Sequence, residues 1–239
     1  MAPGHFPIQS LVVSCHLLVE GPEAVLIDTG LLNDTARIRR LLSRLQLPPS
    51  ALRAILLTHG HLDHARNAAS LFQWSGARIH AHPAEQPHLD GRYPYRGPSR
   101  WCGRLESIGR ALLGHRRVTI HEPLHDGQVL PFWGGLRVVH LPGHTAGHCG
   151  FFSERHGLLF SGDLFASYRS RASLPPPIFN SLPELIPSSL ERALRLDPRG
   201  MIPSHFLGRD WARHRRKFDA LCARVAARGA AAPPPAPIV

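Results

Sequence analysis

The chain has 239 residues, of which 43% are apolar, and a formal net charge of +11 at pH 7. This length and composition are sufficient for one well-packed domain. No apolar run reaches the roughly 18 residues that a membrane span requires, and the first residues lack the basic and apolar regions of a secretion signal. We therefore expect a cytoplasmic protein without a membrane-spanning segment.

The positive charge comes almost wholly from arginine, because Lys217 is the only lysine. Dense basic runs occur only at residues 116–117 and 213–217. A charge run on a helix is most often a solvated face. We therefore expect a small-molecule substrate rather than nucleic acid as the partner, and the composition leaves a homodimer open.

The four cysteines are scattered along the chain without a Cys-x-x-Cys pair: Cys15, Cys102, Cys149 and Cys222. A domain of this size does not need disulfides for stability. We expect reduced and mostly buried thiols.

The first part of the chain predicts strands at residues 11–19 and 24–28. A helix is expected over residues 34–45, because their apolar residues recur on one helical face. The apolar run 54–57 then predicts a buried strand, which ends where the most informative part of the sequence begins.

Residues 58–64 read Thr-His-Gly-His-Leu-Asp-His, with a helix expected to begin near Asp63. Imidazoles and carboxylates are the ligand types that zinc prefers. One metal ion cannot easily take four donors from so short a loop. We therefore expect His59 and His61 to face one metal, and Asp63 and His64 to face a second.

After this run, a helix is expected over residues 65–74, ended by Gly76, and a strand over 77–81. The segment 84–115 is rich in turns and then places four apolar residues at helical spacing, namely Trp101, Leu105, Ile108 and Leu112. The pattern predicts either a surface helix packed on the core or a lid insertion that lines the substrate mouth. Contact of this basic amphipathic helix with a membrane surface is a third interpretation.

The second half repeats strand pairs around residues 128–141 and 149–160. Three further ligand candidates, His144, Asp163 and His205, each follow an apolar run that ends in turn residues. Such strand ends present side chains where loops converge. With the four earlier donors, they make a set of seven ligands for a binuclear centre.

Other residues are candidates for contact with substrate. Tyr168 lies shortly after Asp163, where its hydroxyl could donate to a developing oxyanion. The candidates that line the substrate site are Tyr93, Tyr95, Trp101, Phe165 and Asn180.

The end of the chain predicts one helix over residues 209–228, followed by a tail of proline and alanine at 230–239. The tail cannot bury enough apolar surface to offset the cost of ordering, so we expect it to be disordered. Residues 1–229 are then expected to form a single domain.

The order of motifs resembles the metallo-β-lactamase superfamily, and within it the glyoxalase II-like and lactonase-like two-metal hydrolases. The resemblance covers roughly residues 10–208, and its motifs are Leu-Ile-Asp-Thr-Gly at 26–30, the 58–64 run, Pro-Gly-His-Thr-Ala-Gly-His at 142–148, Ser-Gly-Asp at 161–163 and Pro-Ser-His at 203–205. It implies an α/β fold, a four-layer αββα sandwich in which two mixed β-sheets are flanked by helices.

The resemblance also implies a role for each ligand candidate. His59, His61 and His144 would hold the first zinc, Asp63, His64 and His205 the second, and Asp163 would bridge both. Asp28 and Thr58 would support the ligand loop through hydrogen bonds. His148 would be a supporting or structural partner rather than a ligand.

Such a centre implies a hydrolase. Two zinc ions would share a hydroxide that attacks the substrate, while Asp63 carries a proton during turnover. We expect hydrolysis of a small ester, thioester or lactone. Iron or manganese can replace zinc in ligand sets of this kind.

Three alternatives stay open at this point. An iron-dependent persulfide dioxygenase has a similar motif set, and would hold one iron and consume oxygen. A phosphodiesterase acting on nucleic acid, resembling ribonuclease Z, shares the ligands and suits the positive charge. The third alternative is a member of the fold that binds a partner without catalysis.

Overall fold

The structure is a computed structural model that describes residues 2–10, 13–92, 95, 100–114 and 116–230. Its first sheet has six strands in sequential order: β1 (His5–Gln9), β2 (Ser14–Glu20), β3 (Glu23–Ile27), β4 (Leu52–Leu56), β5 (Arg78–Ala81) and β6 (Glu122–Pro123). The pairs β1–β2 and β2–β3 are antiparallel, whereas β3 to β6 run parallel, so the sheet is mixed.

The second sheet has the order β13-β10-β9-β8-β7. Its strands are β7 (Val129–Leu130), β8 (Leu136–His140), β9 (Cys149–Ser153), β10 (Leu158–Gly162) and β13 (Gly200–Pro203). Only β10 and β13 pair in parallel, so this sheet is mixed as well. A short hairpin of β11 (Ala166–Ser167) and β12 (Ala172–Ser173) lies apart from both sheets.

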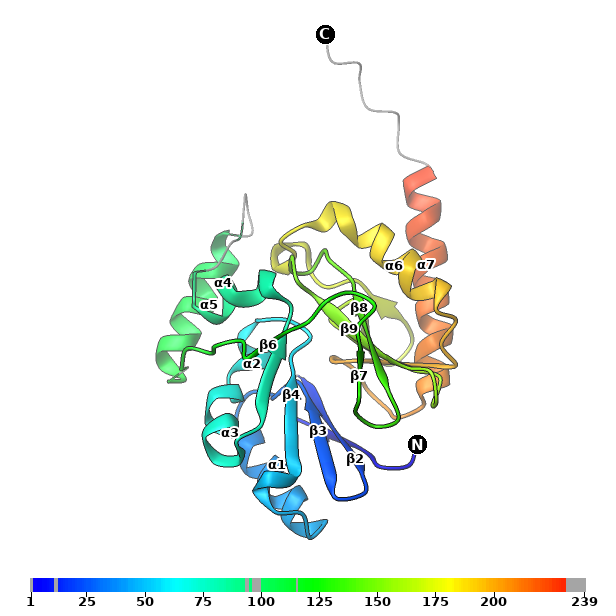
Figure 1. Ribbon diagram of the computed structural model, residues 1–239. Coiled ribbons are helices and arrows are strands. Elements are labelled where there is room, and N and C mark those ends of the chain that lie inside the picture. The colour runs from blue at the N-terminus through cyan, green and yellow to red at the C-terminus, as the bar shows by residue number, and fades with distance from the viewer. Residues whose placement is uncertain (1, 11–12, 93–94, 96–99, 115, 231–239) are drawn as a thin grey trace.

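Helices cover the outer faces of both sheets, and others follow the ends of the strands (Figure 1). They are α1 (Asp34–Arg44), α2 (Leu62–Ala65), α3 (Ala68–Ser75), α4 (Gln86–Leu89), α5 (Arg100–Leu112), α6 (Ile186–Arg195) and α7 (Trp211–Ala230). Helices α1 and α3 flank the first sheet, and α6 and α7 flank the second. This order of layers confirms the predicted αββα sandwich.

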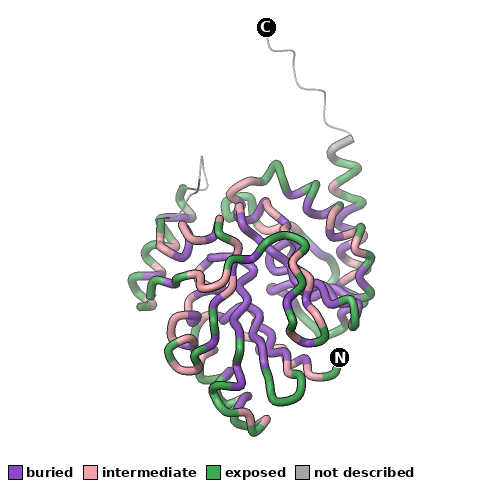
Figure 2. Tube along the Cα trace, in the orientation of Figure 1, coloured by how far each residue is buried: buried purple, intermediate pink, exposed green. Residues whose placement is uncertain are grey.

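Three apolar clusters fill the spaces between the four layers. The first joins α1 and α3 to the outer face of the first sheet and includes Ile38 and Ile55. The second fills the space between the sheets and includes Ile27 and Phe151. The third joins the second sheet to α6 and α7 through residues such as Phe218. The buried residues lie mainly along the strands in the middle of the molecule (Figure 2).

Most predicted elements are found within a few residues of their expected bounds, but the helix expected over 65–74 is broken into α2 and α3. The carbonyl of His64 accepts two hydrogen bonds from Thr29, one from the Thr29 backbone N–H at 2.7 Å and one from the Thr29 hydroxyl at 2.6 Å. This carbonyl is therefore occupied where the helix would continue. The Asn67 amide also bonds the carbonyl of Thr29, at 2.8 Å, and so ties the break to the β3–α1 loop. Gly76 ends α3 in a left-handed conformation, as predicted.

Helix α5 forms where the spacing predicts a helix, but its apolar stripe does not pack on the core. Trp101 is 66% exposed and Leu112 is 80% exposed. The inward face instead carries Glu106 and Arg110, whose side chains pair at 3.0 Å and are less than a tenth exposed. Of the interpretations left open, packing of the apolar stripe on the core is therefore wrong, because the buried ion pair takes the inward face.

Three cysteines, Cys15, Cys149 and Cys222, are free and buried. Burial raises the pKa of Cys149, in agreement with its predicted place in the core. Among the described helices, none combines the length and apolar character needed to cross a membrane. Tyr93 and residues 231–239 of the predicted tail lie outside the described residues.

A pair of buried histidines makes the fold sensitive to acid. His5 and His16 share a hydrogen bond of 3.1 Å between their rings. Burial, followed by the charge of the N-terminus, lowers the pKa of His5 to about 4, and burial lowers that of His16. The unfolded chain therefore binds more protons below pH 6.5, so stability falls as the pH drops from 6.5 towards 4.

We expect His5→Phe to weaken this pH dependence, because phenylalanine keeps the contact with Phe160 but does not titrate. A buried histidine of this kind changes stability by about 3 kcal/mol over its titration range. Urea unfolding between pH 4 and 7 measures the effect, with the exposed His125→Asn as control. An unchanged pH slope in the variant would assign the acid sensitivity to other groups.

Candidate metal centre

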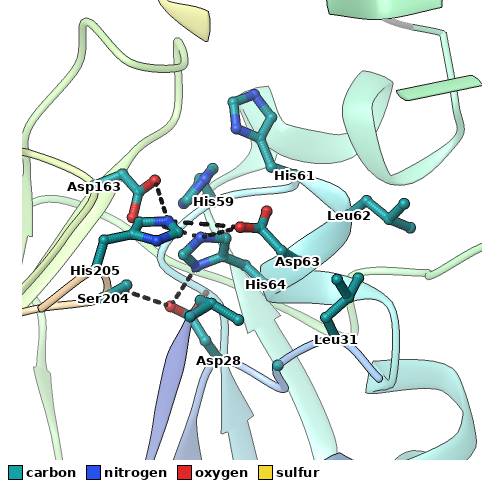
Figure 3. A network of polar contacts seen from close by, with 12 residues as sticks. Asp28, Leu31, His59, His61, Leu62, Asp63, His64, Asp163, Ser204 and His205 are labelled. Atoms are coloured by element: carbon teal, nitrogen blue, oxygen red, sulfur yellow. Dashed lines mark hydrogen bonds and ion pairs between the residues drawn. The ribbon is translucent and has the colours of Figure 1, made fainter. Parts of the chain in front are cut away.

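The seven candidate ligands lie together where segments that follow strands of both sheets meet, and Figure 3 shows all of them except His144. The loop from β4 to α2 carries His59 and His61, and α2 itself carries Asp63 and His64. The other three ligands follow β8, β10 and β13 in the second sheet: His144, Asp163 and His205. The centre therefore lies where loops of the two sheets meet.

The side chains form two clusters with potential ligand atoms no more than 4.8 Å apart. One cluster is His59, His61 and His144, and the other is Asp63, His64 and His205. The same spacing is met by His59, His64 and Asp163, which connect the two clusters, and by His61 with His88 and Glu106.

Asp163 faces both clusters. Its Oδ2 lies 3.5 Å from Nε2 of His144 and 3.1 Å from Nε2 of His205. Its Oδ1 lies 3.5 Å from Nε2 of His64. One carboxylate is thus shared by two groups of imidazoles, which is the arrangement expected of a bridging ligand.

Hydrogen bonds fix the tautomers of three histidines. The Thr58 hydroxyl donates to Asp28 at 2.8 Å, so its oxygen accepts the Nδ1–H of His59 at 3.0 Å. The Nδ1–H of His64 donates to Asp28 at 2.9 Å, and that of His144 donates to Oδ1 of Asn180 at 2.9 Å. This arrangement is the one that orients metal-binding imidazoles.

The buried Nε2 atoms of the same three histidines face the clusters without a hydrogen-bond partner among the described residues. The Oδ1 atom of Asp163 is also buried without one. Buried polar atoms that converge unpaired are costly. A divalent cation would satisfy all of them, so the residues present fit a metal.

In His61 the roles of the two ring nitrogens are reversed. Its Nε2 lies 2.5 Å from the Tyr95 hydroxyl, and that hydroxyl donates to Oε2 of Glu106 at 3.2 Å. The Nε2–H therefore donates to Tyr95, which leaves Nδ1 as the nitrogen for a metal. Tyr95, expected to line the substrate site, thus also serves as a hydrogen-bond partner of His61.

Asp28 supports the second cluster from the end of β3. It adopts a positive φ of 56°, and its carboxylate accepts the Thr58 backbone N–H at 2.8 Å in addition to its bonds with the Thr58 hydroxyl and His64. Ser204, the neighbour of His205, contacts the same carboxylate at 3.5 Å (Figure 3). Asp28 and Thr58 therefore occupy the supporting positions that the sequence predicts.

His148 acts on Asp163 through the backbone. Its Nε2 accepts the Asp163 N–H at 2.9 Å, and its Nδ1–H donates to the Leu141 carbonyl at 3.0 Å. Both ring nitrogens are used, so His148 is a structural partner in this geometry. Gly162 has a φ of 53°, and a Cβ there would lie 2.5 Å from the His148 ring, so glycine is needed.

Carboxylates determine the charge state of the second cluster in the metal-free protein. Burial disfavours the charged His64 ring, but Asp63, Asp163 and Asp28 outweigh it and raise the pKa of His64 to about 10. In the same way, Asp163 outweighs burial and raises the pKa of His205 to about 9. His59 and His61 lie in a buried cluster of imidazoles, and burial lowers their pKa values.

A cavity of about 530 Å³ opens over the two clusters. It is lined by His61, Asp63, His144, Asp163, Phe165, Ala166, Tyr168, Ser173, Leu174, Pro175, Pro176, Phe179 and His205. Apart from the ligands, the lining is mainly apolar, and none of the described lining residues is an arginine or lysine. A second cavity of about 250 Å³ shares His61, Asp63 and Phe179 and is also lined by Tyr95 and Leu105.

The substrate-lining candidates are placed differently by the structure. Phe165 and Tyr168 line the larger cavity, and Tyr168 is 46% exposed. Asn180 is buried and holds His144 rather than lining a described cavity. Trp101 is on the outer face of α5 with the Arg104 guanidinium over its ring, so the expectation that it faces the substrate is not met.

Sequence reasoning missed two buried glutamates beside the centre. Glu85 accepts the backbone N–H groups of Gly60 and Gly147, each at 2.7 Å. Burial raises the pKa of Glu85 to about 7. Glu106 accepts the Leu62 N–H at 3.0 Å. The position of Glu85 just after a predicted strand was an available signal, whereas nothing local marked Glu106.

The family model described as the metallo-beta-lactamase superfamily matches residues 9–205. The chain belongs to this superfamily. Metallo-β-lactamase superfamily proteins are metal-dependent, in agreement with the two ligand clusters described above.

Similar proteins support the same assignment. Hydroxyacylglutathione hydrolase GloC of Haemophilus influenzae is 28% identical over 179 residues, which cover 74% of this chain and 78% of the relative. The metallo-beta-lactamase family protein TTHA1429 of Thermus thermophilus has a TM-score of 0.72 and 25% identity, and the match covers 95% of this chain and 80% of that one. TTHA1623, solved in a di-iron-bound form, has a TM-score of 0.67 and 26% identity over 89% of this chain and 98% of its own.

Proposed function

We propose that the protein is a binuclear hydrolase that cleaves a small ester, thioester or lactone. The observation that carries the proposal is the pair of ligand clusters that share Asp163 beneath one cavity. His59, His61 and His144 would hold one metal, and Asp63, His64 and His205 would hold the other. Zinc suits these nitrogen and oxygen donors, and the di-iron form of TTHA1623 makes iron the main competitor.

Two bound metal ions would supply Lewis acidity and a nucleophile derived from water at neutral pH. The chain's own residues supply orientation and proton transfer. Asp63 has a side chain that is 29% exposed and lines both cavities, so its carboxylate can exchange a proton with a substrate there. The half-exposed Tyr168 presents its hydroxyl at the same cavity, where it can donate to a developing oxyanion.

The cavity favours a neutral, largely apolar substrate. Leu174, Pro175 and Phe179 form apolar walls beside the ligands. Such walls bind methylene groups at about 0.8 kcal/mol each, and a strongly anionic group has no described arginine or lysine in the lining to pair with. GloC is named for glutathione thioesters, so the same bond type with a different, apolar leaving or acyl group is our expectation here.

Metal analysis combined with a substrate panel tests the proposal. The protein would be loaded with zinc or iron, its metal content measured by plasma mass spectrometry, and hydrolysis followed for thioesters, lactones, carboxylic esters and phosphodiesters. We expect two metal ions per chain and hydrolysis of carbonyl substrates, with kcat/KM rising about fourfold per added methylene. A single iron with oxygen consumption, or cleavage of phosphodiesters alone, would contradict it.

A further inference from the structure

The two ligand clusters rest on different supports. The second cluster is tied to the end of β3 through Asp28, which bonds His64 directly. Both clusters take ligands from both sheets, since His205 of the second cluster follows β13. In the first cluster, His59 and His61 follow β4 whereas His144 follows β8. Something must hold these two loops in register if three imidazoles are to meet one ion.

Glu85 is the residue that joins the two loops. Its Oε2 accepts the N–H of Gly60, which lies between His59 and His61, and its Oε1 accepts the N–H of Gly147 in the loop that carries His144. Both distances are 2.7 Å, and Glu85 is fully buried. One carboxylate thus spans the first and second sheets at the first cluster.

The two glycines leave room for the Glu85 carboxylate. A Cβ on Gly147 would lie 2.8 Å from Oε1 of Glu85, and a Cβ on Gly60 would lie 3.2 Å from Oε2 and 2.7 Å from the Cβ of His88. Real Cβ atoms do not approach so closely without a shift of their neighbours. The absence of side chains at these two positions therefore lets both loops reach the same carboxylate.

Glu106 acts on the same cluster from α5. It accepts the Leu62 N–H and the Tyr95 hydroxyl, and Tyr95 in turn accepts the Nε2–H of His61. Arg110 pairs with Glu106 at 3.0 Å and donates to the Gly60 carbonyl at 2.9 Å. The backbone on both sides of His61 and its ring are thereby held by residues of the 84–115 segment.

We propose that Glu85 and Glu106 are positioning residues for the His59, His61 and His144 site, so that their loss weakens metal binding there more than at the Asp63, His64 and His205 site. The inference rests on the proposed function, because it takes the two clusters to be metal sites. Under this proposal, residues of the 84–115 segment hold the first site in position, and the segment does not act as a lid. Supporting partners of this kind change metal affinity about 10- to 100-fold when they are removed.

The test compares Glu85→Gln with wild type and with Asp28→Asn. Glutamine keeps the size of the side chain, but its NH2 group faces one of the two N–H donors and cannot accept it. Zinc occupancy of each site would be measured separately by anomalous scattering from crystals, and both affinities by competition with a chromophoric chelator. We expect zinc affinity at the first site to fall about 10- to 100-fold in Glu85→Gln, with the second site within about twofold of wild type. Asp28→Asn should show its larger loss at the second site.

Tyr95→Phe provides a second variant that should fold, because it removes only the hydroxyl between His61 and Glu106. We expect it also to weaken the first site selectively. Asp34→Asn is a control for general destabilisation, since Asp34 is buried and accepts the Leu31 N–H at 2.9 Å in a loop without ligands. It should lower the melting temperature of the metal-free protein while both zinc affinities are retained.

The possible results distinguish a failure of this inference from a failure of the proposed function. If Glu85→Gln and Tyr95→Phe lower only the melting temperature of the metal-free protein, the glutamates are structural and the inference is overturned. Equal loss at both sites would overturn it as well. If wild-type protein holds no metal in either cluster, the proposed function fails at the first step, before the variants are compared.

Discussion

Asp163→Ala is expected to lower hydrolytic activity by about 1000-fold, which corresponds to a loss of several kcal/mol of transition-state stabilisation. The reason is the position of this carboxylate, with Oδ2 facing His144 and His205 and Oδ1 facing His64. No other described carboxylate contacts imidazoles of both clusters. Its removal should lower the affinity for both metal ions together.

The measurement pairs steady-state kinetics on the best panel substrate with metal content after dialysis. Asp219→Ala is the matched control, because Asp219 lies on α7 and pairs only with Arg215 among the ion pairs of the described residues. It should retain both metals and full activity. Wild-type activity and metal content in Asp163→Ala would remove the shared carboxylate from the mechanism.

Metal binding is expected to release about two protons per chain near pH 7, one from His64 and one from His205. In the metal-free protein, nearby carboxylates raise the pKa values of these imidazoles to about 10 and 9 despite burial. Both rings are therefore protonated at neutral pH and must lose a proton before Nε2 can bind a metal. Metal affinity should rise with pH, by up to about 100-fold per unit between pH 6 and 8.

Calorimetric titration of the metal-free protein with zinc, in buffers of different ionisation enthalpy, counts the protons released. His205→Ala should lower the count by one and leave a shallower pH dependence. An affinity that is independent of pH between 6 and 8 would show that the imidazoles are neutral before the metal arrives.

Local patterns in the sequence located most strands of the two sheets, because apolar runs mark strands that are buried against a core cluster. They did not predict β1 or β6 of the first sheet. The family resemblance then assigned the order of layers. The bounds differ mainly where a side chain from a distant loop intervenes, as at the break between α2 and α3, where Thr29 occupies the His64 carbonyl.

The direction of the α5 face was not predictable in the same way. An amphipathic pattern indicates that one helical face is apolar, but it does not indicate what covers that face. Here Glu106 and Arg110 neutralise each other and bond the metal loop, so the charged face is buried and Trp101 is exposed. A buried ion pair of this kind is visible only when both its partners and the backbone they bond are in place.

The sequence by itself determined most strands and the run of imidazoles and carboxylates at strand ends, because these depend on spacing along the chain and on burial of strands. The order of its motifs indicated the superfamily, and that resemblance implied the two mixed sheets. Beyond Asp28 and Thr58, only the tertiary structure decided which groups hold those ligands. Asn180 meets His144 across 36 residues, and Glu85 meets Gly147 across 62. Such contacts form only when loops of the two sheets come together, and a local pattern of residues does not predict which loops meet.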